Sequence, residues 1–589
     1  MRPQGRTRSV DRGMRGHGIE PRNLYDRDAD AVKPSGRQHG RHRFREVVSG
    51  PARSKTRCTC RTFLRENREV PWLLDVDGTA GRIGKTRGRN PMMHDHGKSD
   101  GSVVAAKHSN KATDVAAEGV EPRGPTKGNT SQQNTPRTQS RNHGVPSELE
   151  RVREVARRDK DAKFTALFHH VTVDRLRSAF GALRRSAAAG VDGVTWKQYS
   201  NDLEDNLRDL HERLHRGGYR AKPSRRVFIP KPDGSQRPLG VASLEDKVVQ
   251  RAVVEVLNAI YEVDFLGFSY GFRPGRSQHM ALDALATGIR RKKVNWVLDS
   301  DIRGFFDAIP HEWLVKFIEH RIADRRLLRL IRKWLNAGVI EDGVKTWTTT
   351  GSPQGATISP LLANIFLHYV FDLWVAQWRR QHARGEMIVV RYADDTVLGF
   401  QHEDDARRFW AELGSRMSKF GLELHSTKTR LLRFGTLASL QCKERGERKP
   451  GTFGFLGFTH ACGKTREGRF KLVRLTSRKR MAARVKAIRV ALHRGRHRPV
   501  PVQGAWLRRV VMGYFAYHAI PTNGHRLQVF RDEVTKAWSH ALRRRSQRHR
   551  MPWSRMHSLA ERWIPRPRIL HPWPDERFDA RTRGRSPVR

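Results

Sequence analysis

The sequence has little cysteine, with four cysteines in 589 residues. So few cysteines do not make a disulfide framework in a chain of this size. Cys58 and Cys60 are separated by one residue, and no second pair follows at the spacing of a zinc site. We therefore expect free thiols in a reducing compartment and no structural zinc.

Acidic residues are also scarce, because 60 Asp and Glu stand against 114 Lys and Arg, for a formal net charge of +54. A surface this positive binds polyanions, with nucleic acid before anionic membrane. We find no apolar run long enough to span a bilayer and no signal-peptide pattern. The sequence therefore predicts a cytoplasmic, nucleoid-associated protein that binds nucleic acid and no membrane. It predicts no particular oligomeric state.

The chain changes character near residue 146. Residues 1–145 are rich in Arg, Gly, Ser, Asn and Thr and poor in apolar runs, so we expect a basic, largely disordered extension. Ser147 and Glu150 then match a helix capping box. Helical periodicity follows in four longer segments: 173–187, 244–263, 311–335 and 359–381. Clustered β-branched residues predict strands in 224–234, 294–302, 387–393 and 396–400.

These elements predict an α+β fold, with an antiparallel sheet and segregated helices. After about Leu475 the strand pattern ends, and the chain becomes basic and helical.

Two adjacent carboxylates, Asp394 and Asp395, stand between apolar runs in "MIVVRYADDTVLGF". Like charges about 4 Å apart repel by roughly 4 kcal/mol at an effective dielectric near 20. Either both side chains are solvated in an ordinary turn, or a cation belongs beside them. Asp301, at the end of the predicted strand "VNWVLDSDI", could share that cation with Asp394. Carboxylates are the ligands that Mg²⁺ prefers, and two-metal nucleotidyl transfer requires such a set.

Eight sequence blocks, in order, resemble those of bacterial group II intron-encoded reverse transcriptase/maturases. They are "GVDGVTW", "SRRVFIPKPDGSQRPLG", "SYGFRPGRSQHMAL", "DIRGFFDAI", "GSPQGATISPLLANIFLH", "RYADDTVLGF", "LELHSTKTRLLRFG" and "FGFLGFTH". The resemblance runs from about Ser147 to about Pro574. It implies a right-hand polymerase with fingers at 146–285, a palm at 286–465, a helical thumb and maturase region at 466–566, and a basic tail at 567–589. The reverse transcriptase domain as a whole would cover about 211–458.

The resemblance also implies a catalytic site. The family's metal ligands fall on Asp301, Asp394 and Asp395, with the backbone carbonyl of Ile302 as a further ligand to two Mg²⁺ ions. The nucleotide-binding positions fall on five residues: Lys231, Arg237, Phe306, Gln354 and Lys428. Lys231 and Arg237 would hold the triphosphate, and Phe306 would exclude a ribose 2′-hydroxyl. Gln354 would contact the nascent base pair, and Lys428 would help to protonate pyrophosphate.

In the family, the last block and the basic helices after it contact primer and RNA. These positions fall on Phe455, Leu456, Gly457, Phe458, Arg478, Lys479, Arg480, Tyr514 and Tyr517. Packing alone is an equal reading for 455–458, and an aromatic core is an alternative for the tyrosines. In this chain "GAT" departs from the family's usual "SPQG" continuation at Ala356 and Thr357. The chain has no paired cysteines of a C-terminal HNH endonuclease.

The function that the resemblance implies is copying of group II intron RNA into DNA, together with assistance to splicing. The partners would be intron RNA, an RNA template, a DNA primer or target, and dNTPs. Three alternatives remain open: a reverse transcriptase of a retron or diversity-generating system, a non-catalytic RNA-binding splicing cofactor, and a viral-type RNA-dependent RNA polymerase. Phe306 and the "YADD" sequence argue against the last of these.

Overall fold

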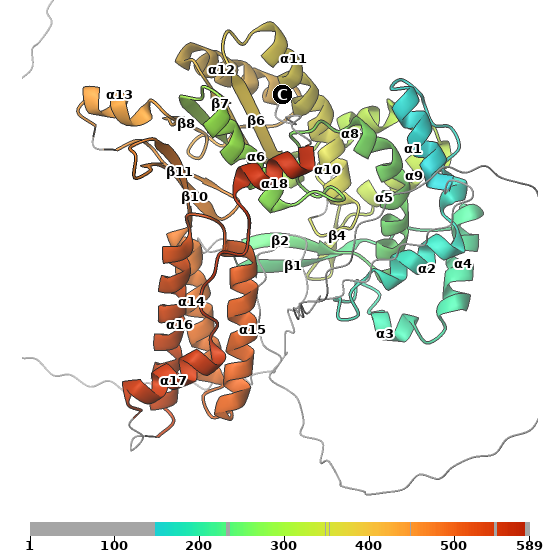
Figure 1. The fold of residues 1–589 in the computed structure, drawn as a ribbon. Helices are drawn as coiled ribbons and strands as arrows, with labels where there is room; N and C mark the ends of the chain where they lie inside the picture. The colour runs from blue at the N-terminus through green and yellow to red at the C-terminus, as the bar shows by residue number, and fades with distance from the viewer. Residues whose placement is uncertain are drawn as a thin grey trace, which may run out of the picture. The chain divides into compact units, whose positions relative to one another are not determined.

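The computed structural model describes residues 148–230, 236–347, 349–352, 354–447, 449–546 and 551–582. The predicted extension 1–145, the Ser147 cap, Cys58, Cys60 and Lys231 lie outside these residues. Figure 1 shows a mixture of helices and strands that gives way, toward the C-terminus, to helices alone. The α+β class predicted from the sequence is confirmed.

The N-terminal helices include one that is long and buried. They are α1 (Glu148–Arg158), α2 (Val173–Gly181), α3 (Trp196–Tyr199), α4 (Leu203–His215), α5 (Leu244–Asp264) and α6 (Gln278–Arg291). α5 begins where the Ser243 side chain accepts a hydrogen bond from the backbone N–H of Asp246. It is apolar on most sides, and α1 and α2 pack against it. A 3₁₀ turn at Phe168–His170 lies between α1 and α2.

A four-stranded antiparallel sheet in the order β6-β7-β3-β8 lies at the centre of the described chain. Its strands are β3 (Trp296–Ser300), β6 (Met387–Tyr392), β7 (Asp395–Phe400) and β8 (Arg430–Arg433). Alternate residues enter two different cores: Leu298 and Val389 lie in one, Val297 and Val390 in the other. Because both faces are covered, the strands read as continuous apolar runs. Helix α12 (Glu403–Lys419) contacts β3 and β7, and α6 contacts β6.

The helical run predicted at 311–335 is two helices. α8 (His311–Glu319) and α9 (Arg325–Leu335) are separated by a turn, and a short helix α7 (Phe305–Ala308) precedes them. Asp324 begins the second helix, because its carboxylate accepts hydrogen bonds from the backbone N–H groups of Arg326 and Leu327. Periodicity continues across the break, so the prediction of one helix was wrong.

The run predicted at 359–381 is helical throughout but not uniform. It comprises α10 (Ser359–Leu367), a π-helical turn (His368–Asp372) and α11 (Leu373–Gln381). By length and mean hydropathy of 1.2, Ser359–Gln381 could cross a bilayer, although 72% of its most apolar window is buried inside the fold. The expectation that no apolar run reaches spanning length was therefore wrong, and the segment is a core helix here.

Two further sheets flank the central one. The first has the order β2-β1-β4-β5, with β1 (Ser224–Pro230), β2 (Gln236–Val241), β4 (Val339–Glu341) and β5 (Val344–Thr346). The second has the order β11-β10-β9, with β9 (Phe453–Phe455), β10 (Phe458–Lys464) and β11 (Phe470–Thr476). A short helix, α13 (Ala438–Glu444), precedes β9, and both Cys442 and Cys462 are free thiols.

After β11 the described chain is helical. The elements are α14 (Arg478–Arg494), α15 (Val500–His518), α16 (Gly524–Arg543), α17 (Trp553–Trp563) and α18 (Pro574–Thr582). α14 to α17 enclose their own apolar core, and Figure 1 shows α14, α15 and α16 side by side. α18 packs instead on α6, where Asp575 pairs with Arg290. Within the predicted basic tail, acidic and basic side chains both make the attachment, since Arg577 pairs with Asp283 of α6.

Candidate active site

The two adjacent carboxylates lie at the tip of the β6–β7 hairpin. Tyr392 pairs with Asp395, so Ala393 and Asp394 form a two-residue turn. Ala393 has a φ of 56°, in the left-handed region that residues with a side chain rarely adopt. Asp394 therefore projects from a turn whose backbone is constrained.

Asp301 follows the last residue of β3, next to the same turn. Ser300 pairs with Thr396, and the same register continued by one residue faces Asp301 toward Asp395. The Asp301 carboxylate accepts a hydrogen bond from the Lys428 ammonium at 2.8 Å, and its backbone carbonyl accepts from the His425 N–H at 2.8 Å. Ile302, the next residue, is buried and bridges to Leu424. The structure thus brings Asp301, Asp394, Asp395 and Lys428 to one end of the central sheet.

The carboxylates at this end of the sheet disfavour one another's charge. Loss of hydration, then the charges of Asp394, Asp301 and Asp299, raise the pKa of Asp395 to about 7, although its surface is partly open to solvent. Loss of hydration and the Asp301 charge also raise the pKa of Asp394, against the lowering effect of Arg237 and Arg391. Burial raises the pKa of Asp299 to about 6. The site therefore favours uptake of positive charge.

The donor chemistry of this end of the sheet fits a divalent cation. Carboxylate oxygens are hard ligands, and their repulsion is relieved when a cation binds between them. In this conformation, however, no three acidic, His or Cys groups of the described residues converge as a ready metal-binding cluster. The Lys428 ammonium is the cation that already contacts Asp301.

Of the predicted nucleotide-binding residues, four are described. Arg237 lies on β2 of the β1–β2 hairpin, and its charge lowers the pKa of Asp394. The Gln354 side-chain amide donates to the Asp307 carboxylate at 3.4 Å. The backbone carbonyl of Gln354 accepts from the Gly240 N–H at 2.6 Å. Phe306 is half-buried, whereas Phe305 is 2% exposed in the core.

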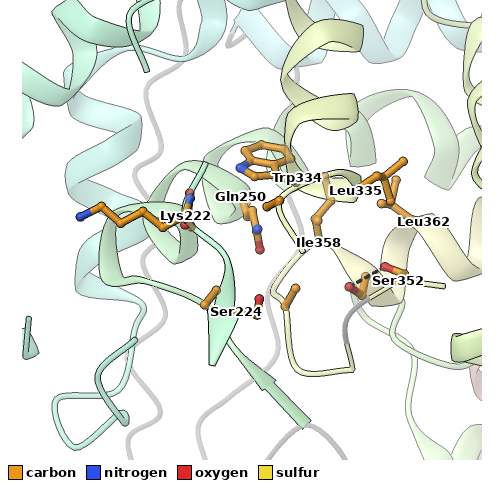
Figure 2. A pocket seen from close by; sticks show the side chains of 13 residues that line it. Lys222, Ser224, Gln250, Trp334, Leu335, Ser352, Ile358 and Leu362 are labelled. Carbon is orange, nitrogen blue, oxygen red and sulfur yellow. Dashed lines mark hydrogen bonds between the residues drawn. The ribbon is translucent and has the colours of Figure 1, made fainter. Parts of the chain in front are cut away.

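A small cavity is lined by Ser352 and Ile358, which lie on either side of Gln354 in the chain (Figure 2). Its volume of about 20 Å³ is enough for a water molecule and far too small for a nucleotide. Ser352 donates to Ser359 at 2.7 Å across the loop, and the Gln250 side chain accepts from the Thr357 N–H at 2.9 Å. The residues around the cavity therefore hold the loop that carries Gln354, and the cavity is not the nucleotide site.

The predicted primer-contact block at 455–458 is a tight turn with a buried flank. Leu456 and Gly457 both have positive φ, between the paired residues Phe455 and Phe458. The side chains of Phe455, Leu456 and Phe458 are buried, so packing accounts for all three. The Arg480 guanidinium lies over the turn at Gly457, which has no side chain to block it.

The predicted RNA contacts in the helical region divide into two groups. Arg478, Lys479 and Arg480 are exposed on the first turn of α14. Tyr514 and Tyr517 are buried, which agrees with the alternative of an aromatic core. Tyr514 stacks on Phe530, and the Tyr517 hydroxyl donates to the Leu456 carbonyl at 2.8 Å. These tyrosines form the core of the helices and their attachment to the β9–β10 turn.

Sequence reasoning missed the residues beneath the hairpin. Gly271, in the "SYGF" block, lies so close that an added Cβ would come within 2.2 Å of the Ala393 nitrogen. Arg391, in the "RYADD" block, is 0% exposed, although Arg is seldom fully buried without a partner. A charged residue inside an otherwise apolar strand was the available signal.

Comparison with known proteins assigns this region. Residues 229–460 match the family model described as "Reverse transcriptase (RNA-dependent DNA polymerase)". The chain is 36% identical over 237 residues to protein YkfC of Escherichia coli, covering 36% of this chain and 62% of that protein. It is 34% identical over 238 residues to the group II intron-encoded protein LtrA of Lactococcus lactis, covering 40% and 39%.

A third relative extends the match. A putative COX1/OXI3 intron 1 protein of Saccharomyces cerevisiae is 25% identical over 401 residues, covering 60% of this chain and 44% of that protein. The chain thus spans less than two thirds of the length of each of these relatives.

Proposed function

We propose, from the premise that residues 229–460 form a reverse transcriptase domain, that this chain is the RNA-directed DNA polymerase of a group II intron. It binds the intron RNA, assists its splicing, and copies it into DNA for intron mobility. Two of the compared relatives are themselves named as intron-encoded or intron proteins, which favours this lineage over a retron or a diversity-generating system.

The observation that carries the polymerase activity is the gathering of Asp301, Asp394 and Asp395 at one end of the central sheet. A bound pair of Mg²⁺ ions would supply activation of the primer 3′-oxygen and neutralisation of the leaving pyrophosphate. Asp301 and Asp394 are the carboxylates that would hold them, with Asp395 and the Ile302 carbonyl in support. A raised pKa at Asp395 means that protons compete with the metal for this site.

The remaining residues bind and orient the nucleotide. Arg237 offers a planar fork to the triphosphate from β2, and Lys231 of the same hairpin is proposed to add a point charge. Phe306 lies one residue after the buried Phe305, where its ring can pack under the sugar and exclude a 2′-hydroxyl. Gln354 is held by Asp307 and Gly240 to meet the new base pair. The Lys428 ammonium, at 2.8 Å from Asp301, is proposed to give a proton to pyrophosphate.

The RNA-binding part of the proposal rests on charge. The chain carries +54, and Arg478, Lys479 and Arg480 are exposed on the first turn of α14, with Arg480 beside the β9–β10 turn. Phosphate contacts of this kind dominate affinity for nucleic acid and weaken with salt. A cytoplasmic, nucleoid-associated location follows as part of the same proposal.

Primer extension tests the proposal. Purified protein with a DNA primer on an RNA template should incorporate dNTPs only when a divalent cation is present. The second candidate, a non-catalytic RNA-binding splicing cofactor, is favoured by the Lys428 ammonium, which already pairs with Asp301. Tight binding of intron RNA without any dNTP incorporation would select the cofactor and exclude the polymerase.

A further inference from the structure

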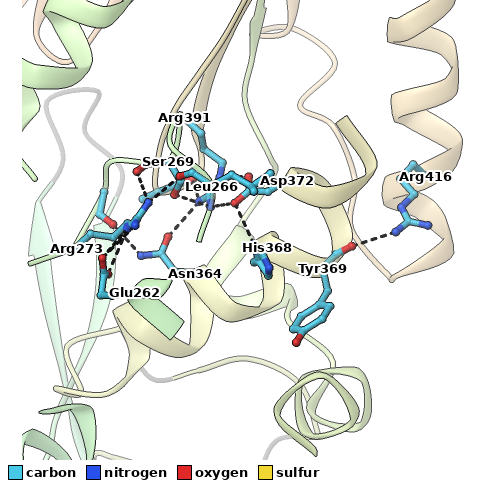
Figure 3. A network of polar contacts seen from close by, with 12 residues as sticks. Glu262, Leu266, Ser269, Arg273, Asn364, His368, Tyr369, Asp372, Arg391 and Arg416 are labelled. Atoms are coloured by element: carbon cyan, nitrogen blue, oxygen red, sulfur yellow. Dashed lines mark hydrogen bonds and ion pairs between the residues drawn. The ribbon is translucent and has the colours of Figure 1, made fainter. Parts of the chain in front are cut away.

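Arg391 lies beneath the hairpin tip with every one of its N–H groups in use (Figure 3). Nε donates to one oxygen of Asp372 at 2.7 Å, and Nη2 donates to the other oxygen. Nη2 also donates to the Ser269 hydroxyl at 2.8 Å, and Nη1 to the Asn364 side-chain oxygen at 3.1 Å. The fifth bond runs from Nη1 to the Ala393 carbonyl at 3.0 Å. The guanidinium is therefore fixed in one orientation.

Asp372, which pairs with this guanidinium, lies in the π-helical turn between α10 and α11. The Asp372 side chain is 0% exposed, and that of Arg391 is 1% exposed. A π-helical turn interrupts the regular direction of side chains along a helix, and such turns are frequent at functional sites. Here the turn aims a fully buried carboxylate at the strand that leads into the hairpin.

The loop between α5 and α6 forms a second support. The backbone N–H of Arg391 donates to the Phe268 carbonyl at 2.9 Å, and the backbone carbonyl of Arg391 accepts from the Tyr270 N–H at 2.8 Å. Arg273, which pairs with Glu262, donates to the carbonyls of Leu266 and Ser269 at 2.8 Å each. The loop is thus held on both sides, and it brings Gly271 against the hairpin turn.

The group held at the end of this network is the strained one. Ala393 has a φ of 56°, a conformation that persists only where the surroundings impose it. Its carbonyl belongs to the peptide unit that leads directly into Asp394. Fixing that carbonyl fixes the direction in which the Asp394 side chain leaves the turn.

We propose that Arg391 and Asp372 are positioning residues, which hold the Ala393 carbonyl and thereby aim the Asp394 carboxylate at the place where a divalent cation binds. The inference rests on the proposed function for its catalytic meaning. Net stability is a poor alternative explanation, because a buried ion pair often contributes little to it. A lysine cannot replace the arginine, since an ammonium lacks the planar fork that serves four acceptor residues at once.

Arg391→Lys and Asp372→Asn test this role, with Arg321→Lys as the matched control. Arg321 is also a buried arginine, with 1% of its side chain exposed. It pairs with Asp264 at 3.0 Å and donates to the Ala162 carbonyl at 2.9 Å, away from the hairpin. The measurements are the thermal unfolding midpoint, amide hydrogen exchange of residues 387–400, Mn²⁺ binding by electron paramagnetic resonance, and primer extension over a range of Mg²⁺ concentrations.

Arg391→Lys is expected to speed exchange at the hairpin, to weaken Mn²⁺ binding by about 10–100-fold, and to raise the Mg²⁺ needed for extension in proportion. Arg321→Lys should lower the unfolding midpoint without any of these changes. Asp372→Asn, which keeps the shape of the side chain, should act in the same direction and serves if Arg391→Lys does not fold.

Unchanged hairpin exchange and Mn²⁺ binding in Arg391→Lys and Asp372→Asn would overturn the inference, and so would equal effects in Arg321→Lys. A wild-type protein that binds Mn²⁺ but extends no primer would remove the proposed function alone. In that case the exchange and Mn²⁺ measurements still decide whether Arg391 positions Asp394.

Discussion

Gly271 lies directly against the backbone of Ala393. The two residues belong to separate loops that are more than a hundred residues apart in the chain. A Cβ at position 271 would come within 2.2 Å of the Ala393 nitrogen and 2.9 Å of the Tyr392 carbonyl carbon. Neither atom can move aside easily, because both belong to the hairpin backbone. The "SYGF" segment thus sets the position of the "YADD" turn.

We expect Gly271→Ala to displace the hairpin tip and to cost about 1–3 kcal/mol of stability, as overpacking does. Primer extension should fall further than the loss of folded protein explains, because Asp394 moves with the turn. Gly414→Ala is the control, since that glycine lies within α12 with no atom near its added Cβ, and it should be neutral or slightly stabilising. Thermal unfolding and extension rates, measured together, check this. Full extension activity in Gly271→Ala would show that the contact does not position the tip.

The raised pKa of Asp395 predicts a metal requirement that depends on pH. Its folded value of about 7 is above the ordinary carboxyl value near 4, so protonation favours the fold. Without divalent cation, this group's stabilising contribution is fully present at low pH and is lost as pH rises through about 7. Because only the carboxylate binds metal, the Mg²⁺ concentration for half-maximal extension should rise as pH falls below about 7.

Two titrations check this pH dependence. The first measures the unfolding midpoint from pH 5 to 8 without metal, and the second measures primer extension as a function of Mg²⁺ concentration at each pH. Asp395→Asn should flatten the first dependence. An Mg²⁺ requirement that stays constant across this range would contradict the assignment of a proton-competing carboxylate.

Asp283 on α6 is expected to be a stability residue rather than a functional one. Its buried carboxylate forms ion pairs with Arg474 of β11 at 3.1 Å and with Arg577 of α18 at 2.7 Å. Asp283→Asn leaves these two arginines without their charge partner, and removing one partner of a buried pair costs about 3–5 kcal/mol. Asp579→Asn, which removes a partly exposed ion pair with Arg291 on the same two helices, should change the unfolding midpoint little. Equal midpoints for the two variants would refute the prediction.

The sequence predicted the centre of this fold well. The four strands expected at 224–234, 294–302, 387–393 and 396–400 overlap β1, β3, β6 and β7. They were recognisable because β-branched residues cluster there in short runs. The placement of Asp301 after a strand and of Asp394 at a hairpin tip followed from the same patterns, so the carboxylates could be expected to approach one another.

What could not be predicted depends on contacts between distant segments. Asp324 divides a periodic run because its carboxylate caps α9 and also accepts from Leu167 and Phe168. Burial of Tyr514 and Tyr517 depends on how the C-terminal helices pack, which aromatic spacing alone does not determine. The use of all five Arg391 donors requires Asp372, Asn364 and Ser269, which converge only in the folded chain.

Phe306 should govern the choice between deoxy- and ribonucleotides. Replacing its ring by the smaller side chain in Phe306→Val opens space where a 2′-hydroxyl would lie, and the rNTP to dNTP ratio of kcat/KM should rise roughly tenfold or more. Phe305→Leu is the control, because Phe305 is 2% exposed in the core and should affect stability but not selectivity. Steady-state kinetics with both nucleotide types measures the ratios. An unchanged ratio in Phe306→Val would assign sugar selection to another residue.

The proposed polymerase activity depends on Asp394, and Asp394→Asn tests this dependence most directly. The measurement is dNTP incorporation on an RNA template, alongside intron RNA binding at one stated salt concentration. We expect incorporation to fall by more than the ~10–100-fold typical of losing a partner of a metal ligand, with RNA affinity unchanged. Asp404→Asn, at an exposed carboxylate on α12, should behave as the unaltered protein. Incorporation that persists in Asp394→Asn would contradict the account.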